Sequence, residues 1–503
     1  MTPRTAVLLC ADLAGDGLDL DELRSAVGAR LPEATVAVVD QLCERPGAAV
    51  ESLRATGATG AVLGVCRRRL PEAELRARAR AGGSATFDLE LVRVPRTRGP
   101  AAAANALAAA AVRLVLTPPG EPSRAVPTRA AFSRGALFRL TPVVSLKPVA
   151  TVAAERCVGF SRCGLCADAC PVRAISPRGD KASVAAAACV TCGRCLAACP
   201  VGAVHIAGAT REQLEAQLAA LLAEPWPAGV LFACAGAVRR LDDDPGLDDW
   251  SVVELPALSI VTPGWVLQVL AAGAARVHLQ PCGGDCCSVW REGGASLELC
   301  RLLLPATLAG RVTVAGLVPP PPHPSPQPSS GHRLGLAEPQ ATTAALRALG
   351  GSELRVTHRA SPLGLVELDP GCTTCGACTS ACPVAALELA DGEDALVLLH
   401  DPALCTGCGL CARVCPERVL HVTRGLDTAR LAAGRLELAS TRRQRCKRCG
   451  TFLPPPAIVD RNRSLLAGGW PLLAGAPRDL CLPCARAGDT IGSSAVASEE
   501  RKS

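Results

Sequence analysis

The sequence predicts a multidomain protein that combines α/β with α+β domains, and three observations lead to this prediction. The chain has 503 residues, 49% of them hydrophobic, so it is long enough to bury several cores. Its 28 cysteines are grouped: four motifs form two tandem pairs, others end strand-like runs in two segments, and two CxxC pairs lie near the C-terminus.

Two proline-rich stretches, Thr117 to Thr128 and Val318 to Gly331, have the composition of extended spacers. Together with the cysteine groups they predict the division of the chain. We expect an α/β domain at 1–116, a linker at 117–144, a cysteine-motif domain at 145–208, a second α/β domain at 209–317, a linker at 318–359, a second cysteine-motif domain at 360–425 and a CxxC module at 441–488.

The first α/β domain is predicted from the short apolar runs "AVLLC", "TVAVVD" and "AVLGVC", which have strand-like length and valine content. Helices are expected at 71–82, between Pro71 and Gly82, and at 101–116. The carboxyl ends of parallel strands open into one crevice. Because Cys10 and Cys66 end two of the runs and Cys43 lies just past the third, we expect these cysteines to converge.

The second α/β domain repeats this arrangement. Thr210 and Gln213 predict a capping box, followed by a leucine face that we expect to pack in the core. Strand-like "GVLFAC" and "ARVHLQ" flank a helix expected at 263–274. Cysteines again follow the strands, at Cys234, Cys282, Cys286 and Cys287. Cys300 and His278 are expected to be ordinary core or surface residues rather than ligands.

The motif C-x2-C-x2-C-x3-C-P occurs three times, and "CVGFSRCGLCADACP" is a variant with a longer first gap. Three closely spaced thiolates can hold one corner of a [4Fe–4S] cubane, whose fourth iron needs a thiolate from elsewhere. Zinc sites usually lack the third cysteine and the proline, so structural zinc is disfavoured. The motif cysteines are Cys157, Cys163, Cys166, Cys170, Cys189, Cys192, Cys195, Cys199, Cys372, Cys375, Cys378, Cys382, Cys405, Cys408, Cys411 and Cys415.

Both tandem pairs resemble bacterial 2[4Fe–4S] ferredoxins, in which the last cysteine of each motif ligates the cluster of the other motif. This resemblance implies four [4Fe–4S] clusters. Glycines at Gly164, Gly193, Gly376 and Gly409 are expected to let the backbone direct N–H groups at sulfur. The longer gap after Cys157 implies a loosely held cluster or a three-iron form. The implied ligand sets are Cys372, Cys375, Cys378 with Cys415; Cys405, Cys408, Cys411 with Cys382; Cys189, Cys192, Cys195 with Cys170; and Cys157, Cys163, Cys166 with Cys199.

The two CxxC pairs near the C-terminus have the layout of a zinc ribbon or a rubredoxin site. The residues are Cys446, Cys449, Cys481 and Cys484, and four thiolates suit a closed tetrahedral zinc, with iron as the competitor. The neighbouring "TRRQRCKRCG" is basic. Because aromatic residues make up only 2% of the chain, we expect a solvated, docking or charge-balancing face rather than a nucleic-acid site.

The N-terminal stretches "AVLLCADLAGDGLDLDELRSAV", "VVDQLCERPGAAVESLRATG" and "AVLGVCRRRLPEAEL" together resemble the N-terminal domain of heterodisulfide reductase A. The resemblance implies a [4Fe–4S] cluster on Cys10, Cys43 and Cys66. Asp12 stands where the family has a fourth cysteine, which implies aspartate ligation, a three-iron form or a lost cluster. The alternative is that the three are buried structural cysteines.

"GVLFAC" and "ELPALSIVTPGWVLQVLAAGAARVHLQPCGGDCC" resemble the delta subunit of methyl-viologen-reducing hydrogenase. That resemblance implies a [2Fe–2S] cluster on Cys234, Cys282 and Cys286, with Cys287 as an extra candidate. Ala257 replaces one family cysteine, so the alternative is a docking domain without a cluster. Heterodisulfide reductase A also has a flavin domain, but no G-x-G-x-x-G follows a strand here, and no flavin is expected.

These observations predict an iron–sulfur protein that relays single electrons between a partner dehydrogenase or hydrogenase and a heterodisulfide-reductase-like complex. The alternatives are a disulfide or sulfur reductase using Cys286 and Cys287, and a regulatory iron–sulfur sensor. The net charge of +7 counts thiols as neutral, and bound clusters of charge about −2 each would cancel it. We expect a cytoplasmic protein with no signal peptide, no membrane span and no nucleic-acid partner.

Overall fold

The chain divides into two compact units. Unit 1 comprises Met1–Glu353 and His358–Pro362, and unit 2 comprises Leu354–Thr357 and Leu363–Ser503. The predicted helix at 71–82, positions 118–144 of the first linker, and Cys286 and Cys287 lie outside the described residues. The computed structural model describes residues 5–66, 88–94, 99–117, 149–224, 229–241, 247, 250–283, 293–314, 332–336, 339–351, 353–393, 395–466 and 478–486.

The first α/β domain is built on a parallel four-stranded sheet of order β2-β1-β3-β4. The two central strands are buried along their whole length, as continuous apolar runs require. The predicted strands and the helix at 101–116 are confirmed. The elements are β1 (Thr5–Cys10), η1 (Ala11–Asp16), α1 (Leu20–Arg30), β2 (Thr35–Val39), α2 (Pro46–Thr56), β3 (Gly60–Val65), β4 (Asp88–Arg93) and α4 (Gly99–Val115).

The second α/β domain has a parallel sheet of order β10-β9-β11-β12. Counted within the domain, this is the same 2-1-3-4 order as in the first sheet. The capping box of Thr210 and Gln213 is present, and the leucine face of α7 is buried. The elements are α7 (Arg211–Leu221), β9 (Val230–Cys234), α8 (Ala235–Leu241), β10 (Ser251–Leu255), η4 (Leu258–Ile260), α9 (Pro263–Ala271), β11 (Val277–Gln280), α11 (Gly293–Leu303), α12 (Ala306–Ala309) and β12 (Val312–Val314).

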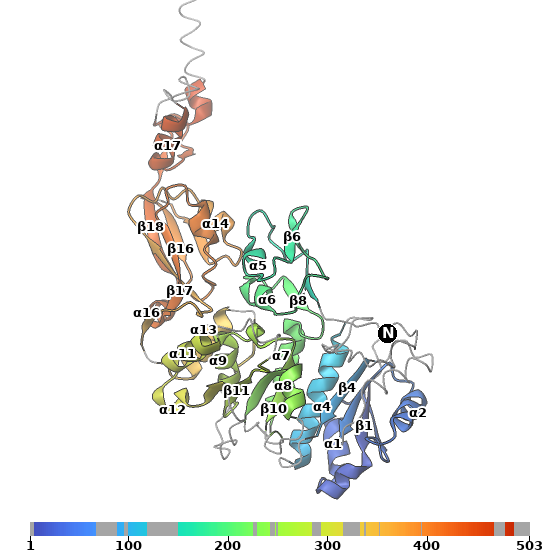
Figure 1. Cartoon of the computed structure of the whole chain (residues 1–503). Helices are drawn as coiled ribbons and strands as arrows, with labels where there is room; N and C mark the ends of the chain where they lie inside the picture. The colour runs from blue at the N-terminus through green and yellow to red at the C-terminus, as the bar shows by residue number, and fades with distance from the viewer. Residues whose placement is uncertain are drawn as a thin grey trace, which may run out of the picture. The chain divides into compact units, whose positions relative to one another are not determined.

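Helices α4 and α7 pack against each other and join the two α/β domains within unit 1 (Figure 1). Alanines cover much of α4, so the helix backbones can approach closely. Asn105 on α4 donates from Nδ2 to the carbonyl of Ala223, at 2.8 Å, and accepts from Nε of Arg30. Gln213 donates from Nε2 to Oγ1 of Thr117, at 2.9 Å. Buried polar contacts therefore fix the helix pairing.

The first cysteine-motif domain consists of two short antiparallel ladders and two short helices. Strand β5 (Ala150–Val152) pairs with β8 (Val204–Ile206), and β6 (Ile175–Arg178) pairs with β7 (Lys181–Val184). Helix α5 (Leu165–Asp168) and helix α6 (Arg194–Ala198) each carry one motif cysteine.

Unit 2 is built from antiparallel sheets of order β13-β17-β14 and β15-β16-β18, followed by the small ladder β19-β20. Short helices again carry motif cysteines. The elements are β13 (Arg355–Thr357), β14 (Gly364–Leu368), α14 (Ala377–Ala381), β15 (Leu387–Asp391), β16 (Ala395–His400), α15 (Leu410–Val414), β17 (Leu420–Asp427), α16 (Thr428–Ala433), β18 (Leu436–Arg442), β19 (Gln444–Arg445), β20 (Phe452–Leu453) and α17 (Pro456–Leu466).

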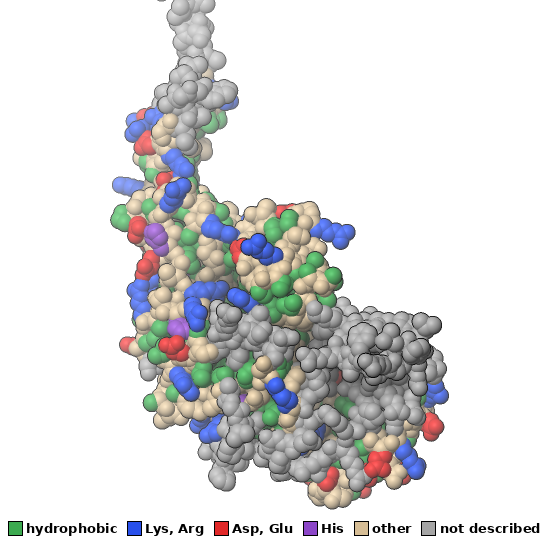
Figure 2. Space-filling model, in the orientation of Figure 1, with side chains coloured by type: hydrophobic (Ala, Val, Ile, Leu, Met, Phe, Trp, Pro, Cys, Tyr) green, Lys and Arg blue, Asp and Glu red, His purple; other side chains and the backbone are tan. Residues whose placement is uncertain are grey.

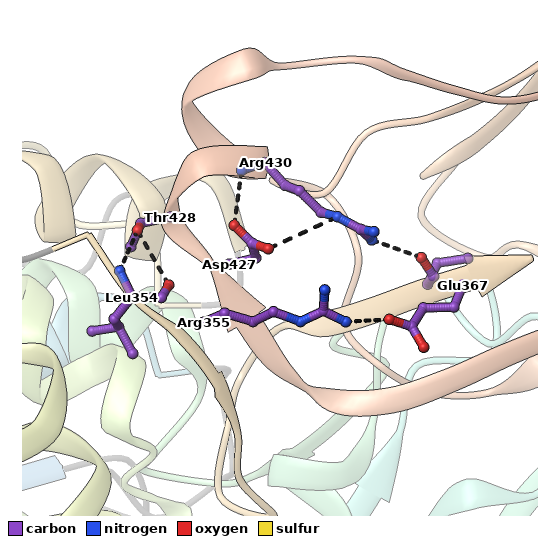
Figure 3. A network of polar contacts seen from close by, with 7 residues as sticks. Leu354, Arg355, Glu367, Asp427, Thr428 and Arg430 are labelled. Atoms are coloured by element: carbon purple, nitrogen blue, oxygen red, sulfur yellow. Dashed lines mark hydrogen bonds and ion pairs between the residues drawn. The ribbon is translucent and has the colours of Figure 1, made fainter.

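A polar network fixes the start of α16 to the neighbouring strands (Figure 3). Asp427 caps α16 by accepting from the backbone N–H of Arg430, at 3.1 Å. Thr428 exchanges hydrogen bonds with the backbone of Leu354, and Arg355 pairs with Glu367. These contacts hold β13 and β14 on either side of β17.

Two predicted boundaries need correction. The range 318–359, predicted as a linker, contains helix α13 (Pro339–Ala348) and strand β13. Helix α13 packs on α9, where Nε2 of Gln268 donates to Oγ1 of Thr342 at 3.3 Å. The proline-rich composition nearby did not predict this tertiary contact. Strand β18 pairs with β16, so the second cysteine-motif domain extends beyond the expected end at 425.

Basic side chains lie around the C-terminal CxxC module, with acidic side chains among them (Figure 2). Lys447 pairs with Asp479 at 2.8 Å. Arg443 and Arg445 both stack on the ring of Phe452, with guanidinium carbons 3.5 and 3.7 Å from its centroid. Several of these charges are therefore engaged within the chain. Every helix in the described part of the chain is too short or too polar to span a lipid bilayer.

Candidate metal centres

Four cysteines from both motifs of unit 2 line one cavity. We call them group A: Cys372, Cys375, Cys378 and Cys415. A second cavity of unit 2 is lined by group B: Cys382, Cys405, Cys408 and Cys411. In each cavity three cysteines come from one motif and the fourth comes from the other. Helices α14 and α15, one from each motif, pack against each other.

The first cysteine-motif domain shows the same crossing. A cavity is lined by group C: Cys157, Cys163, Cys166 and Cys199. The remaining motif cysteines form group D: Cys170, Cys189, Cys192 and Cys195. In group D, burial raises the pKa of Cys195 to about 12, and the Cys192, Cys189 and Cys170 thiols nearby contribute in the same direction.

Each short helix begins after a glycine in the left-handed region. Gly164, Gly193, Gly376 and Gly409 have φ of 67°, 75°, 74° and 74°, a conformation in which a Cβ is costly. The third residue after each closing cysteine is also left-handed, although three of these residues are not glycine. They are Arg173, Gly202, Ala385 and Arg418, with φ of 51°, 63°, 52° and 58°. No feature of the sequence marks this second position.

Backbone N–H groups donate to motif sulfurs at repeated positions. The N–H four residues after the closing cysteine donates to it at 3.2 Å in three cases: Ala174 to Cys170, Ala203 to Cys199, and Ala386 to Cys382. The N–H two residues after the first cysteine donates at 3.4 Å in two motifs: Thr191 to Cys189 and Thr374 to Cys372. Donors directed at sulfur suit thiolate ligands of an iron–sulfur cluster.

Burial sets the protonation of these thiols when no metal competes. Desolvation raises the pKa of Cys378 and Cys405 to about 11, and that of Cys411 to about 12. The same effect raises the pKa of Cys166 to about 11. The thiols are then neutral at pH 7, so binding a metal must displace protons from them. Groups A to D therefore fit thiolate-bound clusters by donor type, number and convergence.

The long gap after Cys157 is held by residues that the sequence analysis missed. The N–H of Phe160 donates to the carbonyl of Asp180 at 2.5 Å, and Ser161 donates to the Asp180 carboxylate at 2.8 Å. Lys181 donates to the carbonyl of Cys157 at 2.6 Å. The β6–β7 hairpin thus ties down the longer loop, and Cys157 lines the cavity with the rest of group C.

The three N-terminal cysteines converge as expected. Sγ of Cys43 lies 3.6 Å from Sγ of Cys10 and 3.2 Å from Sγ of Cys66, and all three are buried. Asp12 does not belong to this group among the described residues. Its Oδ2 is nevertheless buried and without a hydrogen-bond partner in the described part of the chain.

Cys234 ends β9 and Cys282 lies two residues past β11, the two central strands of the second sheet. In the first sheet, Cys10 likewise ends β1 and Cys66 follows β3. A Cβ at Gly236 would lie 3.8 Å from Sγ of Cys282 and 4.0 Å from Sγ of Cys234, so both sulfurs border the same small residue. Ala257, two residues past β10, is buried. The other two residues predicted here, Cys286 and Cys287, lie outside the described part of the chain.

The C-terminal CxxC pairs form one group. The sulfurs of Cys446, Cys449, Cys481 and Cys484 all lie within 4.8 Å of one another. The N–H of Cys481 donates to Sγ of Cys446 at 3.3 Å and holds the pKa of Cys446 at about 6. A tetrahedral four-thiolate site is compatible with this arrangement.

Two residues predicted as ordinary are buried. His278 bonds Oγ1 of Thr313 at 2.7 Å and Oε1 of Gln280 at 2.9 Å, and burial lowers its pKa. Cys300 is buried on α11, and burial raises its pKa to about 12. Neither belongs to a group of potential metal ligands among the described residues.

Comparison with known families identifies the two cysteine-motif domains. The 4Fe-4S dicluster domain matches residues 156–203 and 371–419. Comparison of the chain with curated proteins gives no match. The chain therefore carries two ferredoxin-like 4Fe-4S dicluster domains, which confirms the expectation of ferredoxin-like domains in these two parts of the sequence.

Proposed function

We propose that the protein is a modular electron-transfer chain, with group A, B, C and D cysteines each holding one [4Fe–4S] cluster. Such a cluster, when bound, takes up and releases one electron. The observation that carries the proposal is the crossed arrangement of cysteines around three cavities. Two-cluster ferredoxins need this arrangement, because the fourth ligand of each cluster comes from the other motif.

The packing inside unit 1 supports a connected path rather than isolated domains. Ser259, on η4 of the second α/β domain, donates to the carbonyl of Cys192 in group D. Ile260 lies against Gly193 of the same motif. The carboxyl-end side of the second sheet is thus in direct contact with a group D cysteine loop, where an electron could enter or leave the first dicluster domain.

We further propose that the two α/β domains are the ends of this electron-transfer path, where redox partners dock or where the last centres lie. Cys10, Cys43 and Cys66 offer three converging thiols for an iron–sulfur centre, and Cys234 and Cys282 are two of the ligands of a second one. The resemblance to heterodisulfide reductase A and to the hydrogenase delta subunit suggests the partners: a dehydrogenase or hydrogenase on one side and a heterodisulfide-reductase-like complex on the other. For the C-terminal four-cysteine group we propose structural zinc.

The direct test is metal analysis and EPR of the full chain, purified without oxygen. About sixteen irons with matching sulfide are expected from groups A to D, and more if the α/β domains contribute. Cys411→Ser should alter the EPR signal of one cluster, whereas Cys300→Ser, at a buried cysteine outside every group, should leave all signals unchanged. Zinc with little iron or sulfide would overturn the proposal.

A further inference from the structure

A buried histidine of unit 2 has no hydrogen-bond partner among the described residues. His400 ends β16 and is 1% exposed, and neither its Nδ1 nor its Nε2 is bonded within the described part of the chain. Oγ1 of Thr406, a few residues along the chain, is likewise buried and without a partner in the described structure. Buried polar groups in folded proteins are nearly always satisfied, so two such groups close together indicate that something else supplies the contact.

Both side chains line the cavity of group B. His400 also lines a second, smaller cavity, together with Asp427 and Arg430. An imidazole ring carries at least one N–H in either of its protonation states. His400 can therefore donate to an acceptor in the group B cavity that it lines.

Each of the four motifs has a residue at the position that corresponds to His400, so the four residues can be compared directly. A residue shortly before each motif donates its N–H, at 2.8 Å, to the carbonyl four residues past a closing cysteine. The bonds are Ala153 to Ala203, Ala185 to Ala174, Asp369 to Val419, and Asp401 to Ala386. The residues that directly precede these donors are therefore structurally equivalent: Val152, Val184, Leu368 and His400.

Only His400, which lies five residues before Cys405 of group B, is polar among these four. Val152 lines the cavity of group C, and Leu368 lines that of group A. An apolar side chain there is sufficient for the fold, because three of the motifs use one. The histidine in the fourth is thus a departure that burial makes unfavourable unless the cavity provides an acceptor.

We propose that His400, with Thr406 beside it, donates a hydrogen bond to sulfur of the iron–sulfur centre held by group B and raises its reduction potential above that of the group A centre. The added electron increases the negative charge on sulfur, and an N–H or O–H donor stabilises that charge. His400 is a positioning residue, not a ligand, since group B already supplies four thiols. The inference rests on the proposed function, because it requires group B to hold a cluster.

The test uses the full chain purified without oxygen, with redox titrations followed by EPR. His400→Leu, which installs the residue present at the group A position, should reduce the equilibrium constant for one-electron reduction of one centre about tenfold, equivalent to ~59 mV. Thr406→Val should act in the same direction. The reciprocal Leu368→His should raise the potential of a different centre. Iron and sulfide contents should stay at the wild-type level.

His421→Leu is the matched control, because it makes the same substitution at an exposed histidine of β17, and it should leave every potential unchanged. A second measurement needs no variant to fold: with 15N-labelled histidine, the reduced wild-type protein should show hyperfine coupling to one histidine nitrogen. An unchanged potential in His400→Leu with iron retained would overturn the inference, and so would absence of the coupling in wild type. Absence of iron and sulfide from the wild-type protein would instead refute the proposed function itself.

Discussion

The thiols of Cys43 and Cys66 lie 3.2 Å apart, although the strands that precede them, β2 and β3, are not neighbours in the sheet. Strand β1 separates them and ends in Cys10, 3.6 Å from Cys43. A parallel sheet brings all its carboxyl ends to one edge, so loops that follow the strands can place three sulfurs around one point.

Replacing Cys43 by alanine is expected to remove about three or four irons per chain, as much as one cluster holds. The central thiol contacts both others, so its loss leaves a pair that cannot hold a cluster. Iron and sulfide analysis measures the effect, with Cys300→Ala as the control that should keep the wild-type content. Unchanged iron in Cys43→Ala would identify the three as structural core cysteines.

Cys481→Ser is expected to abolish zinc binding at the C-terminal group, because a closed tetrahedral site needs all four ligands. Metal analysis should show the loss of about one zinc with the iron content retained. Hydrogen exchange should rise in residues 444–453 and 478–486, which the site joins, but not in β14 to β17. Loss of iron in place of zinc would show a rubredoxin-like site.

Gly193→Ala should be more damaging than Gly409→Ala, although both glycines have nearly the same positive φ. The left-handed backbone costs roughly 1–2 kcal/mol in either variant. At Gly193 a Cβ also collides with Ile260, whereas Gly409 faces open space. Overpacking should add about 1–3 kcal/mol, measured by urea denaturation as the stability lost by unit 1 in Gly193→Ala against that lost by unit 2 in Gly409→Ala.

The double variant Gly193→Ala, Ile260→Ala separates the two causes. Ile260 is buried and its truncation is itself destabilising, so the double variant is compared with Ile260→Ala alone. In that background Gly193→Ala should cost only the backbone part. Equal losses in Gly193→Ala and Gly409→Ala would show that the contact with Ile260 contributes nothing.

Arg113→Leu should destabilise unit 1 by about 3–5 kcal/mol, because it leaves the Glu90 carboxylate buried without its partner. Arg113 and Glu90 form an ion pair that is almost completely buried between α4 and β4. Arg156→Leu is the control, since Arg156 and Glu212 pair at 2.9 Å with side chains 52% and 53% exposed, and it should cost at most ~1 kcal/mol. Chemical denaturation of both variants measures the difference, and similar midpoints would contradict the prediction.

Local sequence patterns were sufficient for the elements that their own residues define. The runs ending in Cys10 and Cys234 form strands, and Thr210 caps α7 with Gln213, because strand propensity and capping act over a few neighbouring residues. Local patterns did not predict the elements whose stability depends on a partner distant in the sequence. Helix α13 is stabilised by α9, and β18 by β16. The local composition, proline-rich in one case and polar in the other, therefore did not predict either element.

The sequence by itself determined the chemistry: cysteine spacing defined which thiols are close along the chain, and the glycines inside each motif marked the left-handed turns that let helices α5, α6, α14 and α15 begin. Only the tertiary structure decided what surrounds those thiols. His400 and Leu368 occupy equivalent positions, yet no local pattern indicates that one is buried against group B without a partner among the described residues. Burial and hydrogen bonding depend on packing between segments far apart in the chain. The spacing of residues within one motif therefore does not predict either.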